Sequence, residues 1–312
     1  MRIGLLGAGG ISATHLRAAQ SIAGVEVVAV HGANRDKTHA LAAAAGATPY
    51  DDLDGFLAHP MDIVAIGSPS GLHADQAILA VRRGIHVLVE KPVDTTLEKI
   101  DALVEEADRA RVKVGVFFQE RLLPELQQIK AAIDAGTLGG LLFGSGHVYW
   151  YRPPEYYGES RWRGTQALDG GGVLMNQGIH TVDLLLWLLG PVARVSGRVA
   201  TRCHAIEAED TAAAVLEFES GAYGAIEATT AAAPGYPRRV TIVGTDGMVA
   251  HEDPPRPAAV ADATPHRRVL EDFIDAIQSD RTPACDARDG RRSVAAIQAI
   301  YRSAKSGRWE TP

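Results

Sequence analysis

The chain has 312 residues, of which 46% are hydrophobic, and this length is enough for about two domains with ordinary cores. Acidic residues outnumber basic ones by 38 to 31, and the resulting net charge of -7 disfavours nucleic-acid binding. Two cysteines, Cys203 and Cys285, are too few for a disulfide framework or a thiolate metal cage. No apolar run reaches the roughly 20 residues that span a bilayer, and the N-terminus lacks a signal-peptide cleavage region, so we expect a cytoplasmic protein without a membrane partner.

Up to about residue 120, short aliphatic runs alternate with alanine-rich helical stretches, a pattern typical of βαβ units in a parallel sheet. The expected strands are residues 3–6, 25–30, 63–66, 87–89 and 113–118. The expected helices contain residues 15–21, 36–45, 74–83 and 97–110. We therefore expect an α/β domain at residues 1–120, with the doubly wound parallel sheet of a Rossmann fold.

After residue 120 the pattern changes, and we expect an α+β domain at residues 121–312. Its expected helices are residues 124–135, 174–189, 269–279 and 293–305. Its expected strands are residues 141–151, 192–201, 211–219, 222–229, 238–243 and 248–251. Turn residues such as Ser220-Gly221 and Asp246-Gly247 separate successive strands, which predicts a mostly antiparallel sheet. The run Pro254-Pro255-Arg256-Pro257 predicts a surface loop.

The first expected strand leads into a glycine-rich turn that opens a helix. This turn reads Gly7-Ala8-Gly9-Gly10-Ile11-Ser12, with Ser12 where a third glycine is usual. Glycines at this place let the backbone approach a pyrophosphate at a helix N-terminus, so we expect a dinucleotide site. A tight strand-to-helix turn without a ligand is the alternative.

The end of the second expected strand indicates which dinucleotide is preferred. An acidic residue there usually accepts hydrogen bonds from the ribose of NAD. Here the strand is followed by Asn34, Arg35 and Lys37, with no acid at its end. Because two cations leave charge for a 2′-phosphate, we expect NADP to be favoured over NAD. The alternative is that Arg35 and Lys37 only solvate a helix start.

Three further segments lie where ligands bind in open α/β folds, or carry a dense glycine run. They read Ser68-Pro69-Ser70-Gly71-Leu72-His73, Glu90-Lys91-Pro92 and Asp169-Gly170-Gly171-Gly172-Val173-Leu174-Met175-Asn176-Gln177-Gly178-Ile179-His180-Thr181-Val182-Asp183. Together with the glycine turn, they resemble the Gfo/Idh/MocA family, the glucose-fructose oxidoreductase and inositol dehydrogenase group. The resemblance spans nearly the whole chain.

The resemblance implies a Rossmann domain for NAD(P) and a second domain with a large open sheet, whose other face commonly makes dimers or tetramers. The family's catalytic lysine matches Lys91, and its histidine matches His180. The family's frequent aspartate is Asn176 here, which is similar to the branch that oxidises nucleotide-linked sugar acids. The expected cofactor-binding residues are Gly7, Ala8, Gly9, Gly10, Ile11, Asn34, Arg35, Ser68, Pro69, His73, Glu90, Lys91 and Gln119.

Oxidation of an alcohol needs hydride transfer to the nicotinamide and removal of the hydroxyl proton. Asn176 and His180 are four positions apart, which places both on one face of a helix. His180 is the expected acid/base, since an imidazole exchanges protons near neutral pH. Lys91 is expected to donate a hydrogen bond to the substrate oxygen. For His180 the structural alternative is a hydrogen bond to Asp183, and both roles are compatible.

The segment before the glycine run is dense in aromatic and basic residues. Tyr151, Trp162 and Arg163 are the expected substrate-binding residues here, beside Asn176 and His180, because aromatic faces and arginine donors suit a ring of hydroxyls. A strand with a packed loop is the alternative. His204, Glu207, Glu209 and Asp210 match no metal motif, so we interpret them as a hydrated loop and expect no metal.

We therefore predict an NAD(P)-dependent oxidoreductase that acts on a hydroxyl or ketone of a sugar, cyclitol or sugar derivative. A nucleotide-sugar dehydrogenase is the second interpretation within this class. The alternative from another class is a cofactor-binding regulator without activity, which need not keep Lys91 and His180. We expect a homodimer or homotetramer with a small-molecule substrate.

Overall fold

The computed structural model describes residues 1–253 and 262–312. The expected loop at Pro254-Pro255-Arg256-Pro257 lies outside these residues. The chain divides into two compact units. Unit 1 consists of Met1–Leu122 and Pro257–Gly290, and unit 2 of Leu123–Arg256 and Arg291–Pro312. Residues 257–290 thus group with the N-terminal unit, whereas the sequence suggested one break near residue 120.

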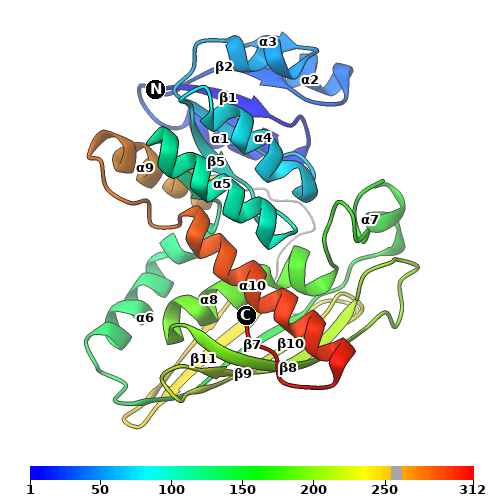
Figure 1. The fold of residues 1–312 in the computed structure, drawn as a ribbon, viewed down its shortest axis with the longest axis vertical. Coiled ribbons are helices and arrows are strands. Elements are labelled where there is room, and N and C mark those ends of the chain that lie inside the picture. Colours follow the sequence, from blue (N-terminus) through cyan, green and yellow to red (C-terminus); the bar gives the residue numbers. More distant parts are fainter. Residues whose placement is uncertain (254–261) are drawn as a thin grey trace. The chain divides into compact units, whose positions relative to one another are not determined.

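A six-stranded parallel sheet forms the centre of unit 1 (Figure 1). Its strands are β1 (Arg2–Leu6), β2 (Glu26–His31), β3 (Thr48–Tyr50), β4 (Ile63–Ile66), β5 (His86–Val89) and β6 (Val114–Val116). The strand order is β3-β2-β1-β4-β5-β6, which confirms the Rossmann topology. The order reverses between β1 and β4, and ligands of doubly wound folds bind outside the carboxyl ends of the strands at this point.

The helices of unit 1 connect these strands. They are α1 (Gly10–Gln20), α2 (Arg35–Ala45), α3 (Leu53–Ala58), α4 (His73–Val81), α5 (Leu97–Ala110) and α9 (Thr264–Gln278). Helix α1 begins directly after its N-cap Gly9, so it opens at the glycine-rich turn as predicted and contains residues 15–20 of the expected helix. The sequence did not predict β3 and α3, which have only three and six residues. Asp52 caps α3 by accepting the N–H of Gly55 at 2.7 Å.

Helix α9 belongs to the core of unit 1 although it follows the second sheet in sequence. Its side chains Val269, Leu270 and Phe273 are buried in the same cluster as Leu5 and residues of β2, β4 and β5. Burial of such side chains contributes roughly 1.5–3 kcal/mol each. This apolar face is the physical reason why the C-terminal segment returns to the N-terminal unit.

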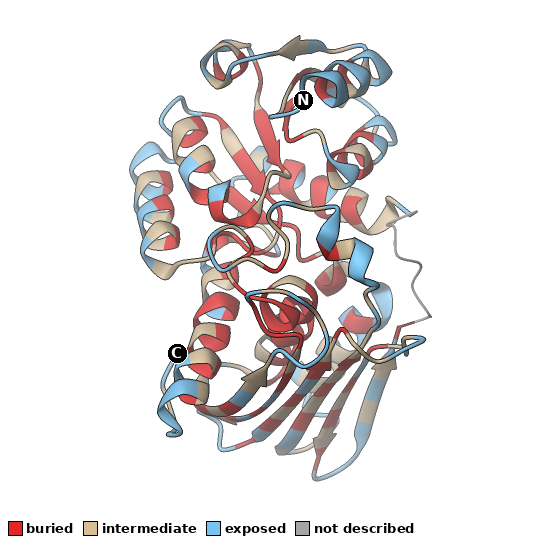
Figure 2. Cartoon of the chain, turned by 90° about the vertical axis from the view of Figure 1, so that its right-hand side faces the viewer, coloured by how far each residue is buried: buried red, intermediate tan, exposed pale blue. Residues whose placement is uncertain are grey.

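A six-stranded mixed sheet forms unit 2, in the order β12-β11-β7-β10-β9-β8. Its strands are β7 (Leu141–Tyr149), β8 (Val192–Ala200), β9 (Thr211–Phe218), β10 (Tyr223–Thr229), β11 (Arg239–Gly244) and β12 (Met248–Glu252). Four neighbouring pairs are antiparallel and β7 with β10 is parallel, so the sheet is mostly antiparallel as expected. Burial alternates along the strands, which shows one packed and one open face (Figure 2).

Helices connect or cover the strands of this sheet. Those of unit 2 are α6 (Pro124–Asp134), α7 (Pro154–Gly158) and α8 (Ile179–Leu189), and α10 (Ala287–Ser306) contains the boundary after Gly290. Helix α8 is almost entirely buried and packs against β7. Within the described part of the chain, no helix is long and apolar enough to cross a membrane.

Candidate active site

The turn between β1 and α1 has the geometry of an anion-binding loop. Gly7 has a φ of +119°, and a Cβ there would lie 2.7 Å from the carbonyl of Gly67. Gly9, the N-cap of α1, provides no side-chain cap, and the first turn holds no acidic residue. The first N–H groups of α1 can therefore serve an anion. A Cβ on Gly9 or Gly10 would meet nothing within 4 Å, so the space that a pyrophosphate needs is open.

The other residues of the turn pack beneath it. A Cβ on Gly32 would lie 3.0 Å from Ala8, and one on Gly67 would lie 2.9 Å from Ile11. The hydroxyl of Ser12 is buried and has no hydrogen-bond partner among the described residues. These contacts hold the turn close to the ends of β2 and β4, and the residues present fit a bound dinucleotide.

The end of β2 carries the residues that bear on cofactor choice. The side chain of Asn34 caps α2 by accepting the N–H of Lys37 at 3.0 Å. Arg35 Nε lies 3.5 Å from Asp51 Oδ1, and both side chains are exposed. The sequence did not predict this partner, because Asp51 follows a strand that was not recognised. Arg35 is therefore next to a carboxylate that repels a phosphate.

The loops after β4 and β5 are tied together by buried polar contacts. The two ring nitrogens of His73 lie 2.8 Å from the carbonyl oxygen of Ser68 and 2.7 Å from that of Pro92. Pro69 caps a short 3₁₀ turn at Ser70–Leu72. Asp94 accepts the backbone N–H of Ala74 at 3.1 Å. His73 is thus a buried link between the two loops rather than a side chain open to solvent.

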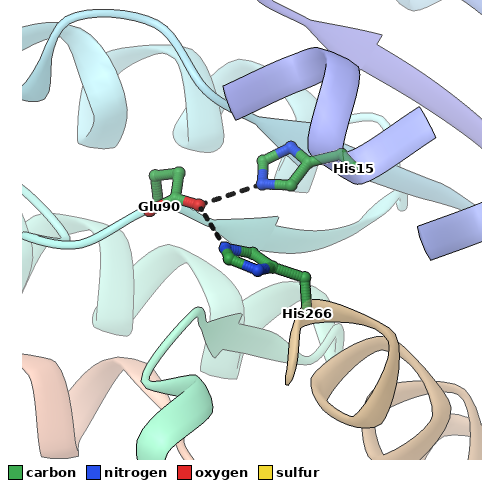
Figure 3. Close-up of side chains that lie close together, drawn as sticks. All are labelled: His15, Glu90 and His266. Carbon is green, nitrogen blue, oxygen red and sulfur yellow. Dashed lines mark hydrogen bonds and ion pairs between the residues drawn. The ribbon is translucent and has the colours of Figure 1, made fainter. Parts of the chain in front are cut away.

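Glu90 and Lys91 follow β5, and Glu90 is buried between two histidines (Figure 3). His15 Nε2 lies 2.9 Å from Glu90 Oε1, and His266 Nε2 lies 3.6 Å from the same oxygen. Burial alone would raise the pKa of Glu90, but both imidazoles outweigh it, so the pKa lies well below its ordinary value. Burial lowers the pKa of His15, against the opposing effect of Glu90. The sequence did not predict this cluster.

Lys91 itself is half-buried, and its backbone N–H donates to Glu90 Oε2 at 3.2 Å. The Lys91-Pro92 peptide bond is cis. Gln119 begins the short 3₁₀ helix after β6, and its Oε1 is buried without a hydrogen-bond partner among the described residues. Lys91 and Gln119 therefore both lie in the connections that follow strands β5 and β6, at the carboxyl edge of the sheet.

In unit 2, the glycine run leads into a π-helix, Val173–Gly178, and then into α8. The sequence predicted one α-helix from about residue 174, so the π-helical turn is a correction. At its start, Glu209 replaces the missing cap: its carboxylate accepts the N–H groups of Gly172 and Leu174, each at 2.9 Å. A Cβ on Gly172 would lie 1.8 Å from the Glu209 carbonyl oxygen, so only glycine fits. Such π-helical turns frequently occur at functional sites.

The interpretation of Glu209 and Asp210 as part of a hydrated loop is wrong. Glu209 is only 5% exposed, and Asp210 is fully buried at 0%. The Tyr301 hydroxyl donates to Glu209 Oε1 at 2.8 Å, and burial raises the pKa of Glu209 despite these hydrogen bonds. Asp210 accepts the backbone N–H groups of residues 202, 203 and 204. Glu209 thus supports the start of the segment that carries the expected acid/base residues, whereas Asp210 holds the loop at residues 202–204.

Asn176 lies in the π-helix and His180 in the first turn of α8. The amide nitrogen of Asn176 donates to Asp169 Oδ1 at 2.6 Å, and Asp169 Oδ2 accepts the N–H of Gly164 at 2.8 Å. His180 is 7% exposed. Asp183, the alternative partner of His180, accepts a hydrogen bond from Ser293 Oγ at 3.2 Å. Asp169 is buried and hydrogen-bonded to Asn176, and the sequence analysis gave it no role.

Two guanidinium groups converge on one aromatic ring in the segment before the glycine run. The Cζ atoms of Arg163 and Arg152 lie 4.2 and 5.2 Å from the ring centroid of Tyr156. Arg163 also lies 5.6 Å from the ring of Trp162, whereas Tyr151 is exposed and pairs with Ala231. Among the described residues, neither guanidinium has a carboxylate partner. The sequence singled out Arg163 but missed Arg152 and Tyr156.

A cavity of about 820 Å³ opens beside Arg163. Its lining includes Tyr157, Arg163, His204 and Glu207, all from unit 2. The size is that of sites for small organic ligands. His204 and Glu207, which the sequence grouped as a loop, thus border this cavity.

Family models match both parts of the chain. Residues 1–118 match the model described as an oxidoreductase family with an NAD-binding Rossmann fold. Residues 126–250 match the GFO/IDH/MocA C-terminal domain. The two matches agree with the two sheets and with the glycine-rich turn.

Individual proteins are similar along nearly the whole chain. The WlbA dehydrogenase of Bordetella pertussis, solved in complex with NADH and UDP-GlcNAcA, is 36% identical with a TM-score of 0.93, over 100% of this chain and 97% of that one. The rhizopine catabolism protein MocA of Rhizobium meliloti is 30% identical, over 95% of this chain and 92% of that protein. Inositol 2-dehydrogenase 2 of Saccharopolyspora erythraea is 29% identical, over 98% and 94%.

Proposed function

Because the chain belongs to the Gfo/Idh/MocA family of oxidoreductases, we propose that it oxidises a ring hydroxyl of a nucleotide-linked sugar acid with NAD. The chain is an NAD-binding oxidoreductase, and its relatives include dehydrogenases of inositol and D-xylose and a dehydrogenase solved in complex with UDP-GlcNAcA. Two further observations favour a nucleotide-linked sugar acid as the substrate.

The arginine pair on Tyr156 carries the proposal. Two positive charges on one ring repel each other, and burial of the Arg152 Nε atom makes this arrangement costly. An anionic ligand would offset the repulsion and accept paired N–H donors. Phosphate and carboxylate groups of a nucleotide-linked sugar acid provide such charges, whereas an inositol does not.

The comparisons support the same substrate class. The WlbA dehydrogenase, which was solved in complex with UDP-GlcNAcA, is 36% identical to this chain. Inositol 2-dehydrogenase 2 is 29% identical. Asn176 stands where the family pattern frequently has aspartate. Oxidation of a free sugar or a cyclitol is the second candidate, and the family relatives that act on inositol favour it.

The chemistry divides between the cofactor and the chain. When bound, the nicotinamide supplies the acceptor for the hydride of the carbinol carbon. We assign to the Lys91 ammonium a hydrogen bond to the substrate oxygen, which stabilises developing negative charge. We assign to His180 the exchange of the hydroxyl proton, and to Asn176 a hydrogen bond that orients a substrate hydroxyl.

The preference for NADP over NAD stays a prediction. Arg35 and Lys37 provide positive charge after β2, but Arg35 pairs with Asp51. A 2′-phosphate would therefore have to compete with a carboxylate for Arg35. NAD has no 2′-phosphate, so it can bind while Arg35 stays paired with Asp51, and we therefore propose NAD as the cofactor.

The open face of the unit 2 sheet supports the expected homo-oligomer. Tyr223, Phe143, Val243 and Met248 form one row across four strands, since each is the register partner of the next. Tyr223 and Met248 are 50% and 60% exposed. Exposed apolar patches of this kind favour burial in an interface. We propose that a second copy of the chain covers this open face.

Turnover of defined substrates tests the proposed function. The purified protein is incubated with NAD and UDP-GlcNAcA, myo-inositol, free sugars or free sugar acids, and NADH absorbance is recorded. We expect oxidation of UDP-GlcNAcA, and we expect Arg163→Met to raise its KM with a smaller effect on kcat. Turnover of inositol or a free sugar in place of UDP-GlcNAcA would show that the second candidate is correct. If no substrate is oxidised, calorimetric titration of the NADH-bound protein with UDP-GlcNAcA tests recognition separately.

A further inference from the structure

Three buried side chains from distant segments meet in unit 1, beside the residue that we assign to catalysis. His15 comes from α1, Glu90 from the end of β5 and His266 from α9 (Figure 3). His15 Nε2 is hydrogen-bonded to Glu90 Oε1 at 2.9 Å. His266 Nε2 lies 3.6 Å from that oxygen, beyond ordinary hydrogen-bond length, so this contact is mainly electrostatic.

The surroundings determine which ring nitrogens carry protons. The His15 ring stacks on Phe117 with a centroid distance of 4.3 Å, and the His266 ring lies 5.4 Å from the same Phe117. Within the described part of the chain, neither Nδ1 atom has a hydrogen-bond partner. Because a buried N–H without an acceptor is costly, the proton of each neutral ring belongs on Nε2, which faces Glu90 Oε1 in both histidines and is hydrogen-bonded to it in His15.

Two histidines and a glutamate are also a ligand set for zinc, and their donor atoms lie within 4.8 Å of one another. Histidines that bind a metal usually donate their second ring nitrogen to a carboxylate, carbonyl or water. His15 and His266 have no such protein acceptor among the described residues. The 2.9 Å separation of His15 Nε2 and Glu90 Oε1 is an ordinary hydrogen bond. The arrangement therefore favours a hydrogen-bonded network over a metal centre.

The second oxygen of Glu90 connects this network to Lys91. Glu90 Oε2 accepts the backbone N–H of Lys91 at 3.2 Å. We propose that His15 and His266 are positioning residues, which hold the Glu90 carboxylate so that it fixes the backbone at Lys91. This inference rests on the proposed role of Lys91 in turnover.

The network has a mechanical consequence for the site. Helix α1 begins at the glycine-rich turn, so His15 joins the cofactor-binding turn and the Lys91 backbone through one carboxylate. His266 joins α9 to the same point. A displacement of a catalytic group by about 1 Å can cost roughly 100-fold in rate. Loss of the His15 contact should therefore reduce kcat more than the affinity for NADH.

Paired variants test the network. His15→Leu and His266→Leu remove the N–H donor, whereas His15→Gln and His266→Gln retain one at nearly the same place. His86→Gln is the matched control, because His86 begins the same strand β5 and its Nδ1 accepts the N–H of Lys113. Three quantities are measured: kcat and KM with UDP-GlcNAcA and NAD, NADH affinity by fluorescence, and hydrogen exchange of the Lys91 amide by mass spectrometry.

We expect His15→Leu to lower kcat about 10- to 100-fold and His266→Leu to lower it less. NADH affinity should change less than about threefold, and the Lys91 amide should exchange faster. The pKa of Glu90 should rise in His15→Leu, because the carboxylate loses one of the two imidazoles that lower it. The glutamine variants should recover most of these losses, and His86→Gln should show none of them.

Several results would overturn the proposal. They are unchanged kcat and Lys91 exchange in both leucine variants, glutamine variants as impaired as the leucine variants, or stoichiometric zinc in the purified protein. If His15→Leu does not fold, the His266 pair provides the same comparison. The exchange measurement requires no substrate, so it tests the network even if UDP-GlcNAcA is not oxidised. If Lys91→Met retains normal turnover, the proposed role of Lys91 fails, whereas an inactive Lys91→Met with normal His15→Leu refutes only the network.

Discussion

The side-chain amide of Asn176 donates a 2.6 Å hydrogen bond to the buried carboxylate of Asp169. Since a carboxylate only accepts hydrogen bonds, the NH₂ group of Asn176 must face Asp169, and its carbonyl oxygen points to the other side. This relationship gives a physical reason for an asparagine at position 176 in this chain. A carboxylate at position 176 would face a second carboxylate at hydrogen-bond distance.

We predict that Asn176→Asp lowers activity and stability. Two carboxylates at this separation must share one proton, so the penalty grows as pH rises and the shared proton is lost. We expect kcat to fall about tenfold or more at neutral pH, and the melting temperature to decrease between pH 5 and pH 8 relative to the parent, over roughly the range where such pairs lose a shared proton.

The double variant Asp169→Asn/Asn176→Asp is the control, because it exchanges the two groups and restores a single negative charge. It should recover most of the stability that Asn176→Asp loses. Equal stability of Asn176→Asp and the parent at all pH values would contradict the explanation of the asparagine.

Removal of either proposed catalytic side chain should reduce turnover. Lys91→Met loses the donor to the substrate oxygen, and His180→Ala loses the proton acceptor, so kcat should fall roughly 10²- to 10⁴-fold in each. Lys305→Met and His39→Ala remove exposed side chains of the same types and should have no effect. Steady-state kinetics checks this, and near-normal kcat in either catalytic variant would refute that residue's role.

Regular periodicity made most of the fold predictable. The strand Ile63–Ile66 and the helix Leu97–Ala110 have the expected bounds, because continuous apolar runs and a long amphipathic pattern mark them. The return of α9 to unit 1 was not predictable, since the apolar face of Phe273 and its neighbours does not reveal which sheet it covers. The parallel pairing of β7 with β10 was unpredictable for the same reason, because strand patterns do not specify non-local partners.

Sequence motifs identified the candidate catalytic and cofactor-binding residues of both units, but not the residues that hold them in place. Glycine turns, Lys91 and His180 stand in local patterns that the family resemblance interprets. His15, His266 and Glu209 act through partners far away in sequence, so no spacing rule connects them. The contact of Asp169 with Asn176 was within reach, because both lie in the glycine-rich segment, only seven positions apart.

Cofactor preference should depend on the contact between Arg35 and Asp51. An exposed ion pair is weak, so Asp51→Asn releases Arg35 and removes a charge that repels a 2′-phosphate. We expect NADPH affinity to rise about twofold to fivefold with little change for NADH. Fluorescence titration with both cofactors measures this, and Arg35→Ala in the same background should cancel the gain. An unchanged ratio of NADPH to NADH affinity in all variants would show that the contact between Arg35 and Asp51 does not determine cofactor preference.

The buried His15 should make the protein sensitive to mild acid. Burial lowers the pKa of His15 in the folded state, so the unfolded chain binds a proton more readily below its ordinary pKa of about 6.5. Stability should therefore fall as pH decreases below that value, and Glu90, whose folded pKa is depressed, adds its loss only at more acidic pH.

His15→Leu should make the decline between pH 7 and pH 5.5, roughly the window where an ordinary imidazole titrates, shallower than in the parent. It should not abolish the decline, because burial also lowers the pKa of His86. Urea unfolding at several pH values measures the slope. A slope as steep as that of the parent would show that His15 does not contribute to acid sensitivity.

The open face of the unit 2 sheet should lose its partner when a charge is placed in the apolar row. Tyr223 is the register partner of Phe143, and the two side chains are 50% and 38% exposed. Tyr223→Glu would place an unpaired carboxylate in the interface, where its desolvation is costly, so we expect the oligomer to dissociate at micromolar concentration. Light scattering after size-exclusion chromatography measures the mass. Gln128→Glu on the exposed side of α6 is the control and should leave the mass unchanged. If the parent is a monomer, or if Tyr223→Glu retains the oligomer, this face is not the interface.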